Sequence, residues 1–275
     1  MAARRMSLAL QYAICVVAAL LIGVPLVNTV LGGFKSTAQL LNQPFGPPNP
    51  VHLENYQRIL VSSTFWQELA NSVIVTSLTV VLLLVSAVGA AFVFARMAFR
   101  GRDVLFNVFT IGLLFPLPVA ILPLFIQLRQ LGLIDTFLGV ALPQVAFSLP
   151  ISVLILRSFF RSVPGELEDA AYIDGCGPIG FLWRVLLPLS MPALAIVAVL
   201  TMVSSWNQFL LPLVVVNSEQ LFTLPLGVMQ FQGQYGTDIA LVMAFLVLAM
   251  IPAVLFYLFA ERYLVAGLTA GAIKE

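Results

Sequence analysis

Six long runs of apolar residues most constrain what this chain can fold into. They cover approximately residues 8–31, 72–95, 104–126, 137–156, 185–207 and 239–260. A helix needs about 20 apolar residues to cross about 30 Å of hydrocarbon, and each run reaches or approaches that length. The runs are continuously apolar, whereas the strands of a membrane barrel alternate over about ten residues. We therefore expect an all-α, polytopic membrane protein with six transmembrane helices.

The composition agrees with a membrane location. Hydrophobic residues make up 61% of the chain and charged residues only 9%, whereas a soluble domain has about 25% charged residues. A soluble chain of this size could not bury so much apolar surface. We expect one transmembrane domain over residues 1–275, in contact with membrane lipid, and the net charge of +1 gives no indication of nucleic-acid binding.

The placement of lysine and arginine predicts the orientation. The first run follows Arg4 and Arg5 as a secretory signal would, but it exceeds the roughly 7–15 apolar residues of a signal core, so we expect a retained span. With the N-terminus inside, ten basic residues fall in inner segments and three (Lys35, Arg58 and Arg129) in outer ones; the inner set is Arg4, Arg5, Arg96, Arg100, Arg102, Arg157, Arg161, Arg184, Arg262 and Lys274. Both termini are therefore expected in the cytoplasm, with residues 157–184 as a cytoplasmic loop.

Two of the segments between the runs are long, and both are expected outside. Residues 35–71 begin with several prolines, which favour extended backbone. Residues 208–238 include an apolar stretch, 209–216, that is too short to span. We expect this stretch to be re-entrant or to lie at the membrane surface.

Several kinds of chemistry are missing from the sequence. The phosphate loop Gly-x-x-x-x-Gly-Lys-[Ser/Thr] does not occur, and His52 is the only histidine, which excludes multi-histidine metal sites. Cys15 and Cys176 are expected at different depths, so we predict no disulfide. The runs carry essentially no ionisable residues at mid-depth, where ion-coupled carriers hold them. If the protein moves a solute uphill, the energy must come from a partner.

Residues 164–178 form an unusual polar segment between the fourth and fifth runs. Pro164 suits a first helical turn, Gly175 and Gly177 suit a helix end, and Pro178 suits the start of another helix. Four acids lie within the segment: Glu166, Glu168, Asp169 and Asp174. On physical grounds the segment is either a capped turn between two spans or an exposed acidic helix that docks on another protein.

The spacing within this segment resembles the EAA loop of ABC importer permeases. The family pattern is Glu-Ala-Ala, three residues, Gly, and about nine residues to Ile-x-Leu-Pro. Here it reads Asp169-Ala170-Ala171, then Gly175, then Val185-Leu186-Leu187-Pro188. Asp169 replaces the usual glutamate, which shortens its reach by one methylene, so Glu168 is a second candidate for the contact. Four further segments of the chain resemble carbohydrate-type importer permeases: Asn55-Tyr56, Asn71-Ser72, Trp206-Asn207 and the tail 267–274.

The resemblance implies the type I ABC importer permease fold and a set of partners. These are a second permease subunit, two ATPase subunits, expected as a homodimer, that bind ATP and Mg, and an extracytoplasmic solute-binding protein in a bacterial or archaeal cell membrane. The chain itself is implied to be neither an enzyme nor a binder of cofactors or metals. The residues implied to couple it to the ATPase are Glu166, Glu168, Asp169, Ala170, Ala171, Asp174 and Gly175.

A sugar path would need hydrogen-bonding groups and aromatic faces. Candidates are Trp206, Asn207 and Gln208 at the end of the fifth run, with Asn107, Gln144 and Ser148 in other runs. The competing interpretation is interfacial anchoring for Trp206 and helix–helix hydrogen bonds for the amides. The solute itself stays open among oligosaccharides, monosaccharides and glycerol phosphate. Two other functions are compatible with a polytopic membrane chain: a passive channel or scaffold subunit, and an intramembrane enzyme, which the missing histidines and acids disfavour.

Overall fold

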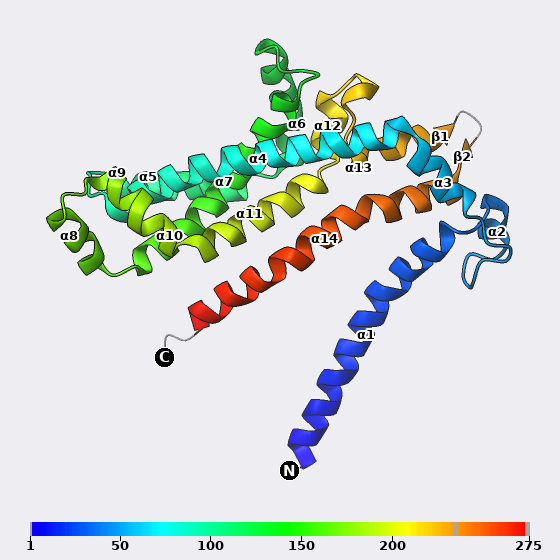
Figure 1. Cartoon of the computed structure of the whole chain (residues 1–275), viewed down its shortest axis with the longest axis horizontal. Coiled ribbons are helices and arrows are strands. Elements are labelled where there is room, and N and C mark those ends of the chain that lie inside the picture. Colours follow the sequence, from blue (N-terminus) through cyan, green and yellow to red (C-terminus); the bar gives the residue numbers. More distant parts are fainter. Residues whose placement is uncertain (1, 234–235, 273–275) are drawn as a thin grey trace. The chain divides into compact units, whose positions relative to one another are not determined.

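The computed structural model describes residues 2–233 and 236–272, with side chains for residues 10–231 and 237–258. Almost all of this part of the chain is helical (Figure 1). Two compact units are present. One contains the residues up to Trp66 together with Gly227–Pro252, and the other contains Gln67–Leu226 together with the residues from Ala253 onward.

The first unit contains the long N-terminal helix and the connection that follows it. Lys35 is buried there, and its ammonium group donates to the carbonyl oxygen of Gln43 at 2.9 Å. Asn55 donates to the carbonyl oxygens of Gly33 and Lys35 at 2.9 and 2.8 Å. These bonds order part of the predicted outer segment 35–71. The elements of the unit are α1 (Ala2–Gly32), α2 (Thr37–Asn42), α3 (Glu54–Val61), the start of α4 (Ser63–Arg96), η4 (Val228–Phe231), β1 (Gln232–Gly233), β2 (Gly236–Thr237) and the first part of α14 (Ile239–Ala272).

The second unit contains most of the chain. Its elements are the rest of α4, α5 (Arg102–Ile111), η1 (Gly112–Leu114), α6 (Leu117–Gln130), α7 (Phe137–Ser162), α8 (Gly165–Ile173), α9 (Pro178–Phe181), a π-helical turn (Leu182–Leu186), α10 (Leu187–Leu189), α11 (Met191–Trp206), α12 (Leu210–Val215), η3 (Glu219–Leu221), most of α13 (Leu224–Gly227) and the remainder of α14.

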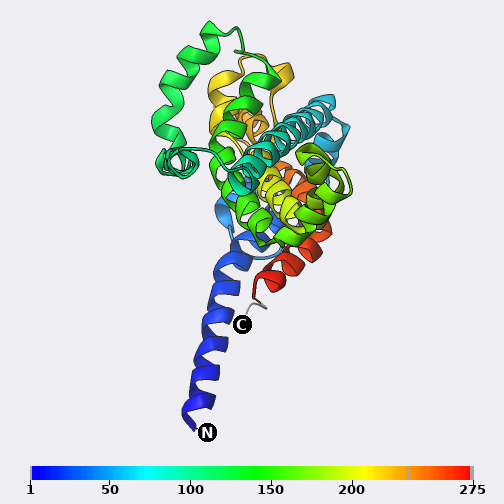
Figure 2. The same cartoon turned by 90° about the vertical axis from the view of Figure 1, so that its left-hand side faces the viewer.

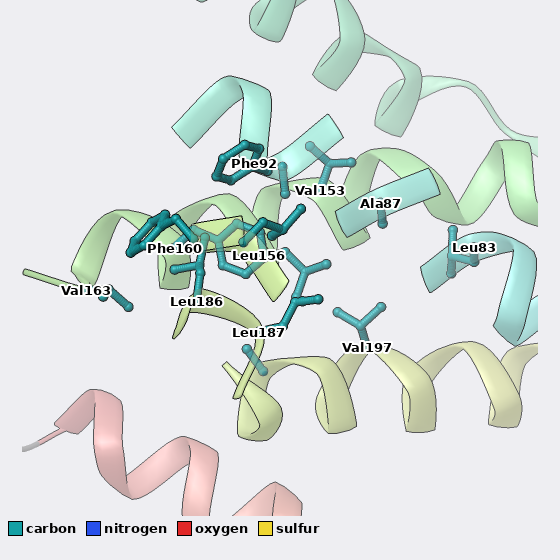
Figure 3. Packing of buried hydrophobic residues seen from close by; sticks show 14 of the residues in the cluster. Leu83, Ala87, Phe92, Val153, Leu156, Phe160, Val163, Leu186, Leu187 and Val197 are labelled. Atoms are coloured by element: carbon teal, nitrogen blue, oxygen red, sulfur yellow. The ribbon is translucent and has the colours of Figure 1, made fainter. Parts of the chain in front are cut away.

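The main core of the second unit lies where α4, α7, the π-helical turn and α11 meet. Figure 3 shows Phe160 and Leu156 of α7 beside Leu186 of the π-helical turn, with Ala87 and Val197 further along the cluster. These side chains are almost fully buried. The core therefore joins three predicted spans at the end of the unit that carries α8.

The predicted spans correspond to four single helices and two bent pairs. Among the residues whose side chains are described, four helices are long and apolar enough to cross a membrane, or six if each bent pair is one span. The pairs are Arg102–Leu114 with Leu117–Gln130, bent by 102°, and Pro178–Leu189 with Met191–Trp206, bent by 77°. The all-α membrane architecture is thus confirmed, but two runs expected as continuous helices are broken.

Prolines explain the break in the third run. Pro116 and Pro118 have no N–H group to donate to the residues four positions earlier. A proline also pushes the preceding residue away from helical geometry, and Phe115 has φ −90° and ψ 110°. The chain therefore turns sharply between α5 and α6, so the two helices point in very different directions, as Figure 2 shows.

The fifth run breaks at Ser190 for a related reason. Pro188 and Pro192 lie on either side of Ser190, and each removes one N–H donor from the helical ladder. The π-helical turn Leu182–Leu186 directly precedes this break. The expected span 185–207 therefore consists of α11 and a separate, shorter stretch before it.

The short apolar stretch 209–216 forms the six-residue helix α12. Leu211 and Val215 of this helix are buried. Val215 packs in a second cluster with Leu128 of α6 and Val140 of α7. The helix is too short to span, as expected, and its apolar side is covered by its own unit. Its depth in the membrane stays a prediction.

Candidate functional site

The polar segment folds as the short helix α8, and its two ends follow the sequence signals. Pro164 is the N-cap residue and Asp174 the C-cap residue. Gly175 has φ +80°, a left-handed conformation that favours glycine. Its N–H donates to the carbonyl oxygen of Tyr172, and the N–H of Cys176 donates to that of Ala171, at 3.1 and 2.9 Å. This pair of bonds is a Schellman motif, which closes the helix and sets the direction in which the chain leaves it.

One face of α8 is exposed. Its residues are Glu166, Asp169, Ala170 and Ile173, spaced at i, i+3, i+4 and i+7, which places them on one side of a helix. Ile173 is 87% exposed, which is unusual for a large apolar side chain. We call these four residues the outer face. It combines two carboxylates, a small residue and an apolar end.

The opposite side of α8 holds the helix on its unit, and we call Glu168, Ala171 and Tyr172 the inner face. Ala171 is 7% exposed and belongs to the main core cluster. One oxygen of Glu168 accepts from the Tyr172 hydroxyl at 2.9 Å, and the other lies 3.3 Å from Nη1 of Arg96. Adjacent acids thus have different surroundings, since Glu168 is turned inward and Asp169 outward.

The hydrogen bond between Tyr172 and Glu168 depends on a protonated phenol. Partial burial raises the pKa of Tyr172, and donation to the Glu168 carboxylate raises it further. The hydroxyl therefore stays a donor at neutral pH. It keeps one oxygen of Glu168 occupied and leaves the other for Arg96.

Arg96 is the last residue of α4, and it reaches the ends of two other elements. Its Nη2 donates to the carbonyl oxygens of Phe160 and Val163 at 2.7 and 2.6 Å. Its guanidinium carbon also lies 5.8 Å from the ring centroid of Phe181. The structure therefore adds Arg96 and Ile173 to the site residues expected from the sequence. Helical spacing from Glu166 could have indicated Ile173, whereas the sequence carried no signal that linked Arg96 to the polar segment.

The expected coupling residues do not all lie on one surface. Asp174 and Gly175 are exposed at the end of α8, next to the outer face. Ala171 is buried and Glu168 is held by Arg96. The seven residues are therefore close together, but only part of the group is open to a partner.

The candidate solute residues have mainly local contacts. Asn207 donates from its amide to the carbonyl oxygen of Val203 at 2.8 Å, which caps α11. Gln208 accepts from the N–H of Leu210 at 3.2 Å at the start of α12. Trp206 is buried rather than exposed. The contacts of Asn207 and Gln208 stabilise helix ends, the ring of Trp206 packs against that of Phe256, and none of these contacts identifies a solute.

Gln144 has the most unusual surroundings among these candidates. Its side chain lies on α7 and is 6% exposed. Neither its amide nitrogen nor its amide oxygen has a hydrogen-bond partner among the residues whose side chains are described. An unsatisfied buried amide is costly, so Gln144 remains a candidate for contact with a bound polar molecule. Ser148, one turn later, accepts through its carbonyl oxygen from the Ser152 hydroxyl at 2.8 Å.

The acids of α8 do not form a metal site. Within the part of the chain that the structure describes, no three or more His, Cys, Asp or Glu side chains gather closely enough to hold an ion. Asp169 and Glu166 instead present separate charges on the outer face. This arrangement suits ion pairs with basic side chains on another protein.

Comparisons with known proteins agree with the resemblance in the polar segment. The pattern of the family described as "Binding-protein-dependent transport system inner membrane component" matches residues 84–269. The chain is 35% identical over 254 residues to an arabinooligosaccharides transport system permease protein of Halalkalibacterium halodurans, covering 91% of this chain and 90% of that protein. It is 33% identical over 268 residues to a diacetylchitobiose uptake system permease protein of Streptomyces coelicolor, covering 97% and 89%.

The fold also has a close counterpart among solved structures. A chain of a bacterial ABC transporter involved in the import of the acidic polysaccharide alginate superposes with a TM-score of 0.83 and 23% sequence identity. The superposition covers 96% of this chain and 98% of that chain. At this identity the similarity establishes the fold alone.

Proposed function

The chain belongs to the family of binding-protein-dependent transport system inner membrane components, as an ABC importer permease, and we propose that the solute it passes is an oligosaccharide. The names of the relatives support this solute class, because the two described above serve arabinooligosaccharides and diacetylchitobiose. The proposed path is shared with a second permease subunit. An extracytoplasmic binding protein would deliver the sugar to it.

The outer face of α8 is the observation that carries the coupling part of the proposal. It presents Glu166, Asp169, Ala170 and Ile173 on a helix whose other side is fixed to the core. An ATPase with a basic, partly apolar groove would bind such a face by ion pairs and by burial of Ile173. The outer face is predicted to be cytoplasmic, so it would lie where ATP is available.

The proposal assigns different tasks to the neighbouring acids. Asp169 is exposed and would make the intermolecular ion pair, in spite of its shorter reach. Glu168 already accepts hydrogen bonds from Arg96 and Tyr172. It would hold α8 in place rather than contact the ATPase.

Gln144 is the strongest of the proposed solute contacts. A sugar hydroxyl can both donate and accept, so it would satisfy the Gln144 amide, which has no partner in the described part of the chain. Asn207 and Gln208 would contribute less, because their contacts already close helix ends, and Trp206 would contribute less because it is buried against Phe256.

An uptake assay tests the solute class. Proteoliposomes would contain this chain with its proposed second permease, ATPase and binding protein. Radiolabelled arabino-oligosaccharides, diacetylchitobiose, monosaccharides and glycerol phosphate would be offered in turn. We expect ATP-dependent uptake of one oligosaccharide class; uptake of glycerol phosphate alone would contradict the proposed solute.

A further inference from the structure

Arg96 connects α4 with α7 and α8, two consecutive helices that lie more than 40 residues after the end of α4 in the sequence. It ends α4, it binds two carbonyl oxygens at the C-terminal end of α7, and it contacts the carboxylate of Glu168 in α8. The side chains of Arg96 and Glu168 are only 10% and 17% exposed. A partly buried, charge-assisted contact of this kind restricts motion more than an exposed ion pair does.

The chemistry of these contacts favours arginine in particular. The last carbonyl groups of a helix lack partners within the helix, and Nη2 of Arg96 satisfies those of Phe160 and Val163. The guanidinium fork can bind these oxygens through one nitrogen and Glu168 through another. Lysine has a single nitrogen and could not reproduce this geometry.

The remaining contacts of α8 are of a different kind. Ala171 belongs to the apolar core, and the ring of Tyr172 lies 6.4 Å from that of Phe181. Such contacts allow sliding or tilting, because dispersion forces have little directional preference. The directional contacts that tie α8 to the ends of α4 and α7 are instead the hydrogen bonds of the Arg96 guanidinium to Glu168 and to the carbonyl oxygens of Phe160 and Val163.

We propose that Arg96 is a positioning residue that transmits displacement of α8 to α4 and α7 during transport. The inference rests on the proposed coupling role of α8. An ATPase that moves the outer face would displace the inner face with it. The end of α7 is joined to α8 by the chain, and through Arg96 the end of α4 would follow as well, so the path between the spans would change.

The test measures how much solute moves for each ATP hydrolysed. The complete transporter would be reconstituted with wild type, Arg96→Ala, Arg96→Lys and, as a matched control, Arg102→Ala. Arg102 is a nearby basic residue whose contacts are to Asp103 and Met97 and not to α8. Allosteric couplings typically change an equilibrium by roughly 5–150-fold, so we expect the transport-to-ATP ratio to fall at least about fivefold in Arg96→Ala.

Three further readouts distinguish positioning from a general structural effect. The ATPase should still co-purify with Arg96→Ala, and its basal hydrolysis should stay near the wild-type rate, because the outer face is unchanged. The sugar concentration for half-maximal uptake should also be unchanged. Arg96→Lys should restore little of the ratio, and Arg102→Ala should match wild type.

A wild-type ratio in Arg96→Ala would overturn the inference. If Arg96→Ala fails to insert into the membrane, Glu168→Ala provides the test, because Arg96 then keeps its contacts with the carbonyl oxygens of Phe160 and Val163. The transport-to-ATP ratio should fall in Glu168→Ala, and an unchanged ratio would refute the proposal. Failure of the proposed function looks different: the wild-type assembly itself would bind no ATPase or move no sugar.

Discussion

At the scale of single residues, the sequence predicted the ends of α8 but not the directions of its acids. Proline, glycine and spacing signals located the helix correctly. Glu168 and Asp169 are adjacent, and only the tertiary contact with Arg96 shows that the first faces inward. Arg96 is 72 positions away from Glu168, so no local pattern could have paired them. Asp169, which replaces the glutamate of the family pattern, is therefore the exposed acid on the outer face.

Gly175 provides a residue-scale prediction. Its φ of +80° is strained for other residues, yet an added Cβ would meet nothing within 4 Å. Gly175→Ala should therefore act through the backbone alone, at a cost of about 1–3 kcal/mol. We expect ATPase co-purification to weaken as α8 loses its fixed end. Gly177→Ala is the control, since Gly177 has φ −79° and equal space. Equal effects of both variants would contradict this explanation.

Asp135 gives a prediction about pH. It accepts hydrogen bonds from the backbone N–H groups of Asn217 and Ser218 and from the Ser218 hydroxyl. The Ser218 hydroxyl first, and then the two N–H groups, lower the pKa of the Asp135 carboxyl. A carboxyl group whose pKa is lowered by folding stabilises the protein fully when the pH is above its pKa in the unfolded chain, about 3.9. This stabilisation is lost as the pH falls through the pKa of the group in the folded protein.

Asp135→Asn tests that dependence. Asparagine tolerates the positive φ of 61° at this position, so the change isolates the charge. In detergent, the variant should melt at a lower temperature than wild type at pH 7, and the difference should shrink below about pH 4. A difference in Tm that is constant with pH would show that the carboxylate charge contributes nothing.

At the scale of elements, apolar runs predicted which segments are helical but not where they bend. The third and fifth runs contain prolines that interrupt the hydrogen-bond ladder, and the structure bends by 102° and 77° near them. Proline is also present inside α7 and α14, which stay continuous. Whether a proline breaks a helix depends on how neighbouring elements pack, and that information is not local.

The outer face of α8 gives a prediction at this scale. Burial of an isoleucine side chain contributes about 1.5–3 kcal/mol, and Ile173 is 87% exposed. Ile173→Ser should therefore weaken ATPase binding by about tenfold or more. The control is Leu131→Ser at the end of α6, which is also exposed but lies outside α8. ATPase affinity measured by titration should fall only in the first variant, and an unchanged affinity would remove Ile173 from the docking surface.

At the scale of the whole molecule, the sequence predicted the class of protein well. Membrane-length runs, the missing phosphate loop and the spacing of the polar segment led to an ABC importer permease, which the family and the fold confirm. The orientation of the termini, the partner subunits and the solute residues stay predictions. They depend on the membrane and on other chains, whose contacts a single sequence does not encode locally.

ATP-driven sugar uptake by wild type and Asp169→Lys tests the central claim most directly. Both assemblies would be reconstituted in proteoliposomes with binding protein, and uptake and membrane insertion would be measured together. We predict uptake by wild type that requires ATP and binding protein, and its loss in Asp169→Lys with insertion unchanged. Uptake by Asp169→Lys at the wild-type rate would contradict the claim that the outer face of α8 couples ATP hydrolysis to transport.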